Sequence, residues 1–182
     1  MSQATAPEIM IRKETAADHV AVFTLIEEAF RTEEFSDHQE QFLVERLRNS
    51  AAFIPELSLV AEKQGEVVGH ILLTRIEIIE GDAFHASLAL APVSVHPDHQ
   101  GQGIGTMLIE QAHLAAREQG HDSIVLLGHA EYYPRFGYVP AHNFDIRLPF
   151  EAPPENCMVL ELQPGALTGV SGLVKYATAF FE

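Results

Sequence analysis

The spacing of hydrophobic and polar positions changes several times along the chain, and each change marks an expected element. Partial alternation in residues 8–14 predicts a first strand. Apolar residues then recur at helical spacing in residues 15–30 and 36–50, which predicts two consecutive helices. Both segments begin as a capping box does, with Thr15 three residues before Asp18 and Ser36 three residues before Gln39.

The middle of the chain is strand-like. Short glycine-containing turns at residues 64–65 and 80–82 separate apolar runs, a pattern typical of antiparallel strands joined in sequence. These runs cover residues 57–62, 66–79 and 83–95. Ala91-Pro92 falls inside the last run, and proline cannot donate a hydrogen bond to a neighbouring strand. We therefore expect a bulge or a local opening of the sheet at Pro92.

The second half of the chain combines a helix with further strands. An amphipathic helix is expected from residue 104 to Gly120. Its expected apolar face consists of Ile104, Met107, Leu108, Ala112 and Ala115. A buried strand is expected at residues 123–128, a short helical turn before Gly137, and later strands at 144–149, 157–162 and 170–176.

This order of elements predicts an α+β fold around a mixed sheet. We expect one domain over residues 1–182, with a core at about 7–150 and additional C-terminal strands over 151–182 packed on it. Residues 151–156 are the best candidate for a domain boundary, and a turn between late strands is the alternative.

Composition narrows the classes of partner. Asp and Glu number 26 against 11 Lys and Arg, a formal net charge of −15, which argues against a general nucleic-acid or anionic-membrane binder. The charge favours a cationic substrate or serves solubility alone. The single cysteine, Cys157, permits no internal disulfide and suits a reducing compartment. With no signal-peptide pattern and no apolar run of membrane-spanning length, the expected location is the cytoplasm.

Three glycines precede the expected helix in "QGQGIGT", residues 100–106. A helix N-terminus offers unpaired N–H groups and partial positive charge, and glycine lets an anion approach them. The segment is therefore a candidate phosphate site, and a tight turn with close helix–sheet packing is the alternative. It matches neither the nucleotide-binding loop that ends in Gly-Lys-Ser/Thr nor the dinucleotide-binding pattern.

Together with the hydrophobic strand before it, this segment resembles the acetyl-CoA-binding motif of the GNAT superfamily of N-acetyltransferases. A second motif of that family, an aromatic-Tyr pair followed by three residues and Gly-aromatic, is matched downstream by "YYPRFGY". The stretch "LLGHAEYYPRFGYVPA" is most similar to the small bacterial branch of predicted N-acetyltransferases. The resemblance implies a mostly antiparallel sheet flanked by helices, with one splayed pair of strands.

The resemblance also implies an activity and a set of site residues. Acetyl-CoA would be the co-substrate, and the acetyl group would pass directly to a primary amine of a small molecule or peptide in a ternary complex. Tyr133 would be the general acid that protonates the leaving thiolate; its alternative role is that of an aromatic core residue. Residues expected to bind coenzyme A are Val93 and Val95 through their backbone, and Gln100, Gly101, Gln102, Gly103, Gly105 and Thr106 at the pyrophosphate.

Several roles stay open at this point. The strand before the tyrosine motif lacks the glutamate that serves some family members as general base, so His70, His85, Glu28 and a water chain remain candidates, and none is assigned. Gly128-His129 replaces the family's frequent asparagine, and Arg117 and Arg135 are candidates to reach coenzyme A phosphates. No metal site is expected, a homodimer is possible, and a non-catalytic acyl-CoA-binding module is the alternative function.

The acids around the first two helices are either a solvated face or, as the resemblance implies, the lining of an acceptor site that attracts a positively charged amine.

Overall fold

In residues 8–182, which the computed structural model describes, nine strands form one mixed sheet. The strands are β1 (Ile9–Lys13), β2 (Phe53–Lys63), β3 (Glu66–Glu80), β4 (Ala83–Val95), β5 (Ser123–Leu127), β6 (Val139–Pro140), β7 (Ile146–Arg147), β8 (Cys157–Glu161) and β9 (Gly172–Lys175). The α-helices are α1 (His19–Phe30), α2 (Glu40–Arg48) and α3 (Ile104–Glu118). No helix in this part of the chain is long and apolar enough to cross a membrane.

The strand order is β1-β2-β3-β4-β5-β8-β6, with β9 beside β3 and β7. Only the β4–β5 and β7–β9 pairs are parallel, which confirms the expected mixed, mostly antiparallel sheet. The long strand β3 pairs with β2 along its first part and with β9 over residues 77–79. The late strands expected from the sequence are therefore hydrogen-bonded into the same sheet, where β8 pairs with β5.

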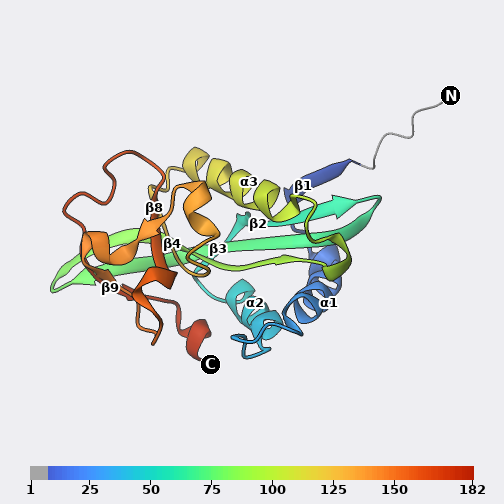
Figure 1. Cartoon of the computed structure of the whole chain (residues 1–182), viewed down its shortest axis with the longest axis horizontal. Helices are drawn as coiled ribbons and strands as arrows, with labels where there is room; N and C mark the ends of the chain where they lie inside the picture. Colours follow the sequence, from blue (N-terminus) through green and yellow to red (C-terminus); the bar gives the residue numbers. More distant parts are fainter. Residues whose placement is uncertain (1–7) are drawn as a thin grey trace.

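The helices cover opposite faces of this sheet (Figure 1): α3 lies on one face, and α1 and α2 lie on the other. Successive strand residues point to opposite faces. Ile71 and Leu73 of β3 accordingly join the cluster that contains Leu108 of α3, whereas Leu72 joins the cluster under α1 and α2. Burial of these two apolar layers holds the helices against the sheet.

The two expected capping boxes differ in outcome. The first is confirmed, since the backbone N–H of Thr15 donates to the Asp18 carboxylate at 2.7 Å. The second is wrong: α2 begins at Glu40, and the Ser36 hydroxyl donates to the Glu40 carboxylate instead. His38 adopts a left-handed φ of 59°, so the chain forms a turn here rather than the first turn of a helix.

Helix α3 begins and ends as expected, with Gly120 at φ 83° just after it. Its buried face is partly different from the expected one, because Met107 is 37% exposed and Ile109 and Ala116 are buried. The face that meets the sheet therefore centres on Leu108 and Ala112.

Strand β4 contains the predicted irregularity. Ile71 lies opposite Val93 and Leu73 opposite Leu90, so Ala91 and Pro92 together face the single residue Leu72. This is a β-bulge of one extra residue. On its other side β4 pairs with β5 only at residues 88–89, and beyond them the two strands separate. This separation is the splayed strand pair expected from the resemblance.

Candidate functional site

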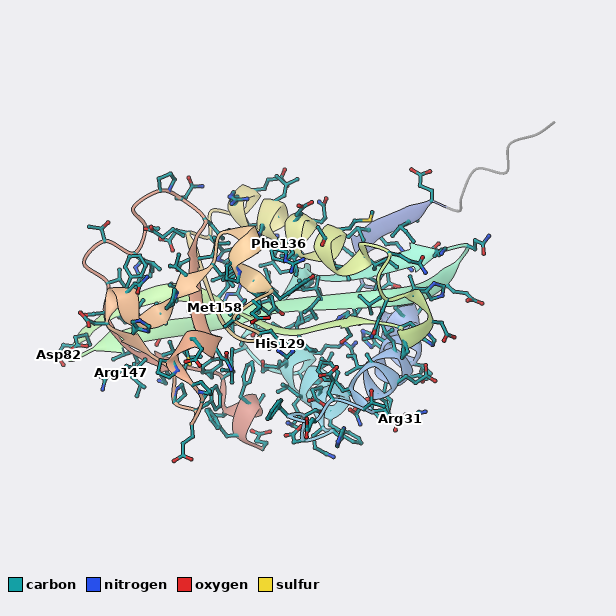
Figure 2. All side chains as sticks on the ribbon, viewed as in Figure 1. Arg31, Asp82, His129, Phe136, Arg147 and Met158 are labelled. Carbon is teal, nitrogen blue, oxygen red and sulfur yellow. The ribbon has the colours of Figure 1, made fainter. Side chains whose placement is uncertain are left out.

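A pocket of about 590 Å³ opens where β4 and β5 separate. One wall is the end of β4, residues 90–95, together with Gln100 and Gly105. The opposite side contains residues 127–129, Tyr132 and Tyr133, and a third side is formed by α1, α2 and the loop between them. Figure 2 labels His129, which lies near the middle of the molecule in the connection that follows β5.

The edge of β4 that faces this pocket has unpaired backbone groups. The His96 N–H donates to the Val68 carbonyl at 2.8 Å, which makes these two residues a hydrogen-bonded pair of the β3–β4 ladder. Such pairs alternate along an antiparallel ladder with pairs whose backbone groups point outward. Val93 and Val95 belong to the pairs that are not hydrogen-bonded to β3. Their backbone N–H and C=O groups therefore point away from β3 and toward the gap between β4 and β5.

The loop after β4 exposes a row of backbone N–H groups. None of the N–H groups of residues 101–106 donates to another group in residues 8–182, and the first helical bond runs from the Met107 N–H to the Gly103 carbonyl at 3.1 Å. Gly101 and Gly103 have φ of 76° and 80°. No atom lies within 4 Å of the position a Cβ would take at either residue, so the space beside the loop is open. This arrangement can bind an anion through the backbone alone.

The side chains around the loop have more specific positions. The Gln100 side chain donates to the Val95 carbonyl at 3.2 Å, which fixes the start of the loop to the end of β4. A Cβ at Gly105 would lie 3.2 Å from the Tyr132 hydroxyl, so glycine permits this close approach. Thr106 lies in the first turn of α3, next to the row of N–H groups.

One cationic side chain at the loop was missed by the sequence analysis. Lys63, at the end of β2, donates to the Gln102 side-chain carbonyl at 3.0 Å. The antiparallel β2–β3–β4 arrangement gives the reason, because it brings the turn after β2 beside the chain that leaves β4. Of the two arginine candidates, Arg117 donates to the Leu162 carbonyl near the other end of α3, and Arg135 lies over the Tyr132 ring.

Tyr133 lies in the wall of the pocket and is 7% exposed. Its ring packs edge-on against Tyr132 and Tyr138, with centroids 5.1 and 5.7 Å apart. Burial raises the pKa of the Tyr133 hydroxyl above its usual value, so the phenol is protonated at neutral pH. It can therefore donate a proton or a hydrogen bond to a group in the pocket.

The three side chains considered as general bases do not line this pocket. His70 is fully buried under α1, with Nε2 3.2 Å from the Ser58 hydroxyl, and burial lowers its pKa to about 4. His85 pairs with a carboxylate of Asp122, and Glu28 pairs with His96. The acids that do line the pocket are Glu33 and Glu40, which the sequence analysis grouped only as part of an acidic segment.

Among residues 8–182, no three His, Cys, Asp or Glu side chains are grouped closely enough to hold a metal ion.

Comparison with known proteins identifies the family. The Acetyltransferase (GNAT) domain matches residues 55–140. The uncharacterized N-acetyltransferase YjhQ of Escherichia coli (strain K12) is 36% identical over 147 residues, which cover 76% of this chain and 80% of YjhQ. The chain belongs to the GNAT acetyltransferases. It is therefore an acyltransferase.

Solved structures of this family share the whole fold. The GNAT N-acetyltransferase YhbS of Escherichia coli, solved in complex with CoA, superposes with a TM-score of 0.88 at 27% identity, covering 100% of this chain and 97% of that one. A GNAT acetyltransferase of Brucella melitensis, solved in complex with acetyl-CoA, has a TM-score of 0.77 at 35% identity, covering 95% of this chain and 98% of that one. The mixed sheet with its splayed strands is thus the fold of the family.

Proposed function

We propose that the protein transfers an acetyl group from acetyl-CoA directly to a primary amine. The observation that carries this proposal is the set of backbone groups along β4 and the glycine loop that no other backbone group pairs with. The N–H groups of residues 101–106 suit the pyrophosphate. The outward N–H and C=O of Val93 and the outward N–H of Val95 suit the amides of the pantetheine arm, which would pair with β4 as an added strand does, while the Val95 carbonyl accepts from Gln100. The complexes of the YhbS and Brucella melitensis proteins with CoA and acetyl-CoA support the same choice of co-substrate.

The proposed roles continue along the pocket. Gly101 and Gly103 leave the loop open to the phosphates, with Gln102, Gly105 and Thr106 adding donors, and Gln100 holds the loop against β4. The arm then leads from the loop along β4 to Tyr133. The Tyr133 phenol donates the proton that the departing thiolate takes up.

Direct transfer is favoured over a covalent acyl-enzyme. Cys157 lies on β8 and does not line the pocket, and burial raises the pKa of its thiol. A thiol with a raised pKa is a poor nucleophile near neutral pH because little of it is thiolate.

We also propose that residues 1–182 form one domain. The pairing of β8 with β5 and of β9 with β3 supports this, because the C-terminal strands complete the sheet on which the pocket is built. Limited proteolysis tests it: a stable fragment that ends near residue 150 and still binds acetyl-CoA would contradict a single domain.

Tyr133→Phe tests the catalytic proposal. Thiol release with a panel of amines should fall at least about a hundredfold, as expected for loss of a general acid, while the Kd for acetyl-CoA by calorimetry stays within about twofold. Tyr176→Phe is the matched control, since Tyr176 is similarly buried, its pKa is also raised by burial, and it lies outside this pocket.

Three results would count against the proposal. Unchanged turnover in the Tyr133→Phe enzyme removes the acid role. Binding of acetyl-CoA without thiol release for any amine favours the acyl-CoA-binding module. Thermal stabilisation by ATP or NAD but not by coenzyme A rejects the co-substrate.

A further inference from the structure

The pocket continues past β4 to the α1–α2 side of the sheet, where its charged groups have one sign. Ala29 and Phe30 at the end of α1 and Leu43 of α2 give this side an apolar lining. Glu33, in the loop between the helices, and Glu40, the first residue of α2, are the carboxylates in it. No lysine or arginine among the described residues lines the pocket.

The Glu40 carboxylate is held by a hydrogen bond to only one of its two oxygens. Its Oε1 accepts a hydrogen bond from the Ser36 hydroxyl, which fixes the side chain against the loop. Its Oε2 is shielded from solvent and has no hydrogen-bond partner in residues 8–182. A carboxylate oxygen that has lost water and has found no donor is costly, so a donor that arrives with a ligand is bound at this position with a gain in free energy.

Ser94 provides an independent sign of the same site. It lines the pocket and is 3% exposed, and its hydroxyl has no partner in the described part of the chain. Ser94 lies opposite His70 in the β3–β4 register, and the His70 ring reaches Ser58 and Glu14 on the α1 side of the sheet. Because cross-strand partners point to the same face, the Ser94 side chain lies on that side too.

The two faces of the sheet at the end of β4 therefore carry different side chains, apolar on one and polar on the other. The side chains of Val93 and Val95 pack on the α3 side, whereas Ser94 points to the side of Glu40. The α1–α2 side of the pocket therefore combines an apolar wall with an unpartnered hydroxyl and an unpartnered carboxylate oxygen that lie just beneath its surface, both shielded from solvent.

We infer that this side of the pocket binds the acceptor as an alkylammonium ion, with Glu40 as the residue that determines its charge. The ammonium donates to Oε2 of Glu40, and the Ser94 hydroxyl accepts a second hydrogen bond. Transfer of one ammonium proton to Oε2 leaves the neutral amine that attacks the thioester. The carbon chain of the acceptor lies against Phe30 and Leu43, and Glu33 attracts the cation at the mouth. Acidic amines are excluded by the two carboxylates. This inference rests on the proposed function and adds the substrate class to it.

Coenzyme A thioethers test the inference without knowledge of the natural acceptor. S-(ω-aminoalkyl)-coenzyme A compounds with two to six carbons carry the ammonium at graded distances from sulfur, and S-alkyl compounds of equal length lack it. Calorimetry gives the Kd for each pair and for coenzyme A. In the wild-type protein at least one aminoalkyl compound should bind roughly tenfold more tightly than its alkyl partner, as for a charged hydrogen bond of about 1.4 kcal/mol.

Glu40→Gln should reduce this ratio to less than about threefold while the Kd for coenzyme A itself stays unchanged. Glu45→Gln, an exposed glutamate on the same helix that does not line the pocket, is the matched control and should keep the full ratio. Ser94→Ala should lower the ratio partially, which gives a second variant if Glu40→Gln does not fold.

The outcomes separate this inference from the proposed function. Equal Kd values for every matched pair in the wild type overturn the inference, and so does a charge preference that survives Glu40→Gln. Failure of coenzyme A itself to bind overturns the proposed function, and the inference falls with it.

Discussion

A side chain added at Gly128 would meet the ring of Tyr133 in the pocket wall, and Gly128→Ala tests how firmly that ring is held. A Cβ at Gly128 would lie 2.5 Å from Cε2 and 3.0 Å from Cδ2 of Tyr133, and 3.3 Å from Leu126. Carbon atoms in contact prefer about 3.5–4.0 Å, so the ring must move by roughly 1 Å. Tyr132 and Tyr138 pack against the ring and oppose this movement.

The backbone itself accepts alanine, because Gly128 is not among the glycines with positive φ. The cost is therefore overpacking alone. Overpacking in a core costs about 1–3 kcal/mol, and the 2.5 Å contact suggests about 2 kcal/mol here. A displacement of about 1 Å at a catalytic group can lower the rate about a hundredfold, so we expect thiol release to fall at least about tenfold.

Urea unfolding measures the loss of stability caused by Gly128→Ala, and thiol release measures the loss of rate. The stability measurement is repeated with Gly128→Ala introduced into the Tyr133→Leu variant. Leucine removes the ring atoms that the new methyl group meets, so Gly128→Ala should then cost less than about 1 kcal/mol. An equal cost in both backgrounds, or a cost below about 0.5 kcal/mol in the wild-type background, would refute the assignment of strain to this contact.

Three further predictions concern the sheet, the interior and the loop. Gly172→Ala should destabilise the fold by more than about 3 kcal/mol in urea, because its Cβ would overlap a backbone carbonyl of β3 at a φ of 122°; wild-type stability would contradict this. His70 and His113 have pKa values lowered to about 4 by burial, so the unfolded chain binds protons from pH 6.5 downward and the folded chain does not. The free energy of unfolding should be nearly constant above pH 8 and fall by about 2 kcal/mol per pH unit between pH 6 and 4.5, with about half of this fall lost in His113→Asn; equal stability at pH 7.5 and 5 would exclude this. Lys63→Ala should weaken coenzyme A binding roughly fivefold at low salt, an effect that Lys175→Ala should not reproduce and that calorimetry measures.

Much of the fold could be predicted because its signals are local. The turn at Gln64-Gly65 follows from Gly65, which adopts a positive φ without steric cost, and Gln64 beside it has a positive φ as well. The bulge follows from a proline that cannot join a ladder, and the start of α3 follows from the glycines before it. In each case the residues that carry the signal are the ones that set the geometry.

What could not be predicted depends on contacts between distant segments. Ser36 and Gln39 have the spacing of a capping box, but the Ser36 hydroxyl donates to the Glu40 carboxylate and α2 begins only at Glu40. Met107 has the spacing of a buried residue, yet the sheet meets α3 on a face rotated away from it. Glu40 is one of many acids in its segment, and its place in the pocket wall arises only when α1 and α2 pack against the sheet.

The proposed roles place the two partners on different sides of the sheet, which would explain how so acidic a chain binds both an anionic co-substrate and a cationic acceptor. The glycine loop presents backbone N–H groups, whose partial positive charge does not depend on the net charge of −15. The carboxylates of Glu33 and Glu40 lie on the α1–α2 side, where an anionic cofactor arm is not expected and a cation is attracted. Strand β4 separates the two by alternation: its backbone edge and its valines serve one side, and the side chain of Ser94 serves the other. An acidic surface is then no obstacle to binding a polyanion, because most of the groups proposed to bind it are backbone N–H groups.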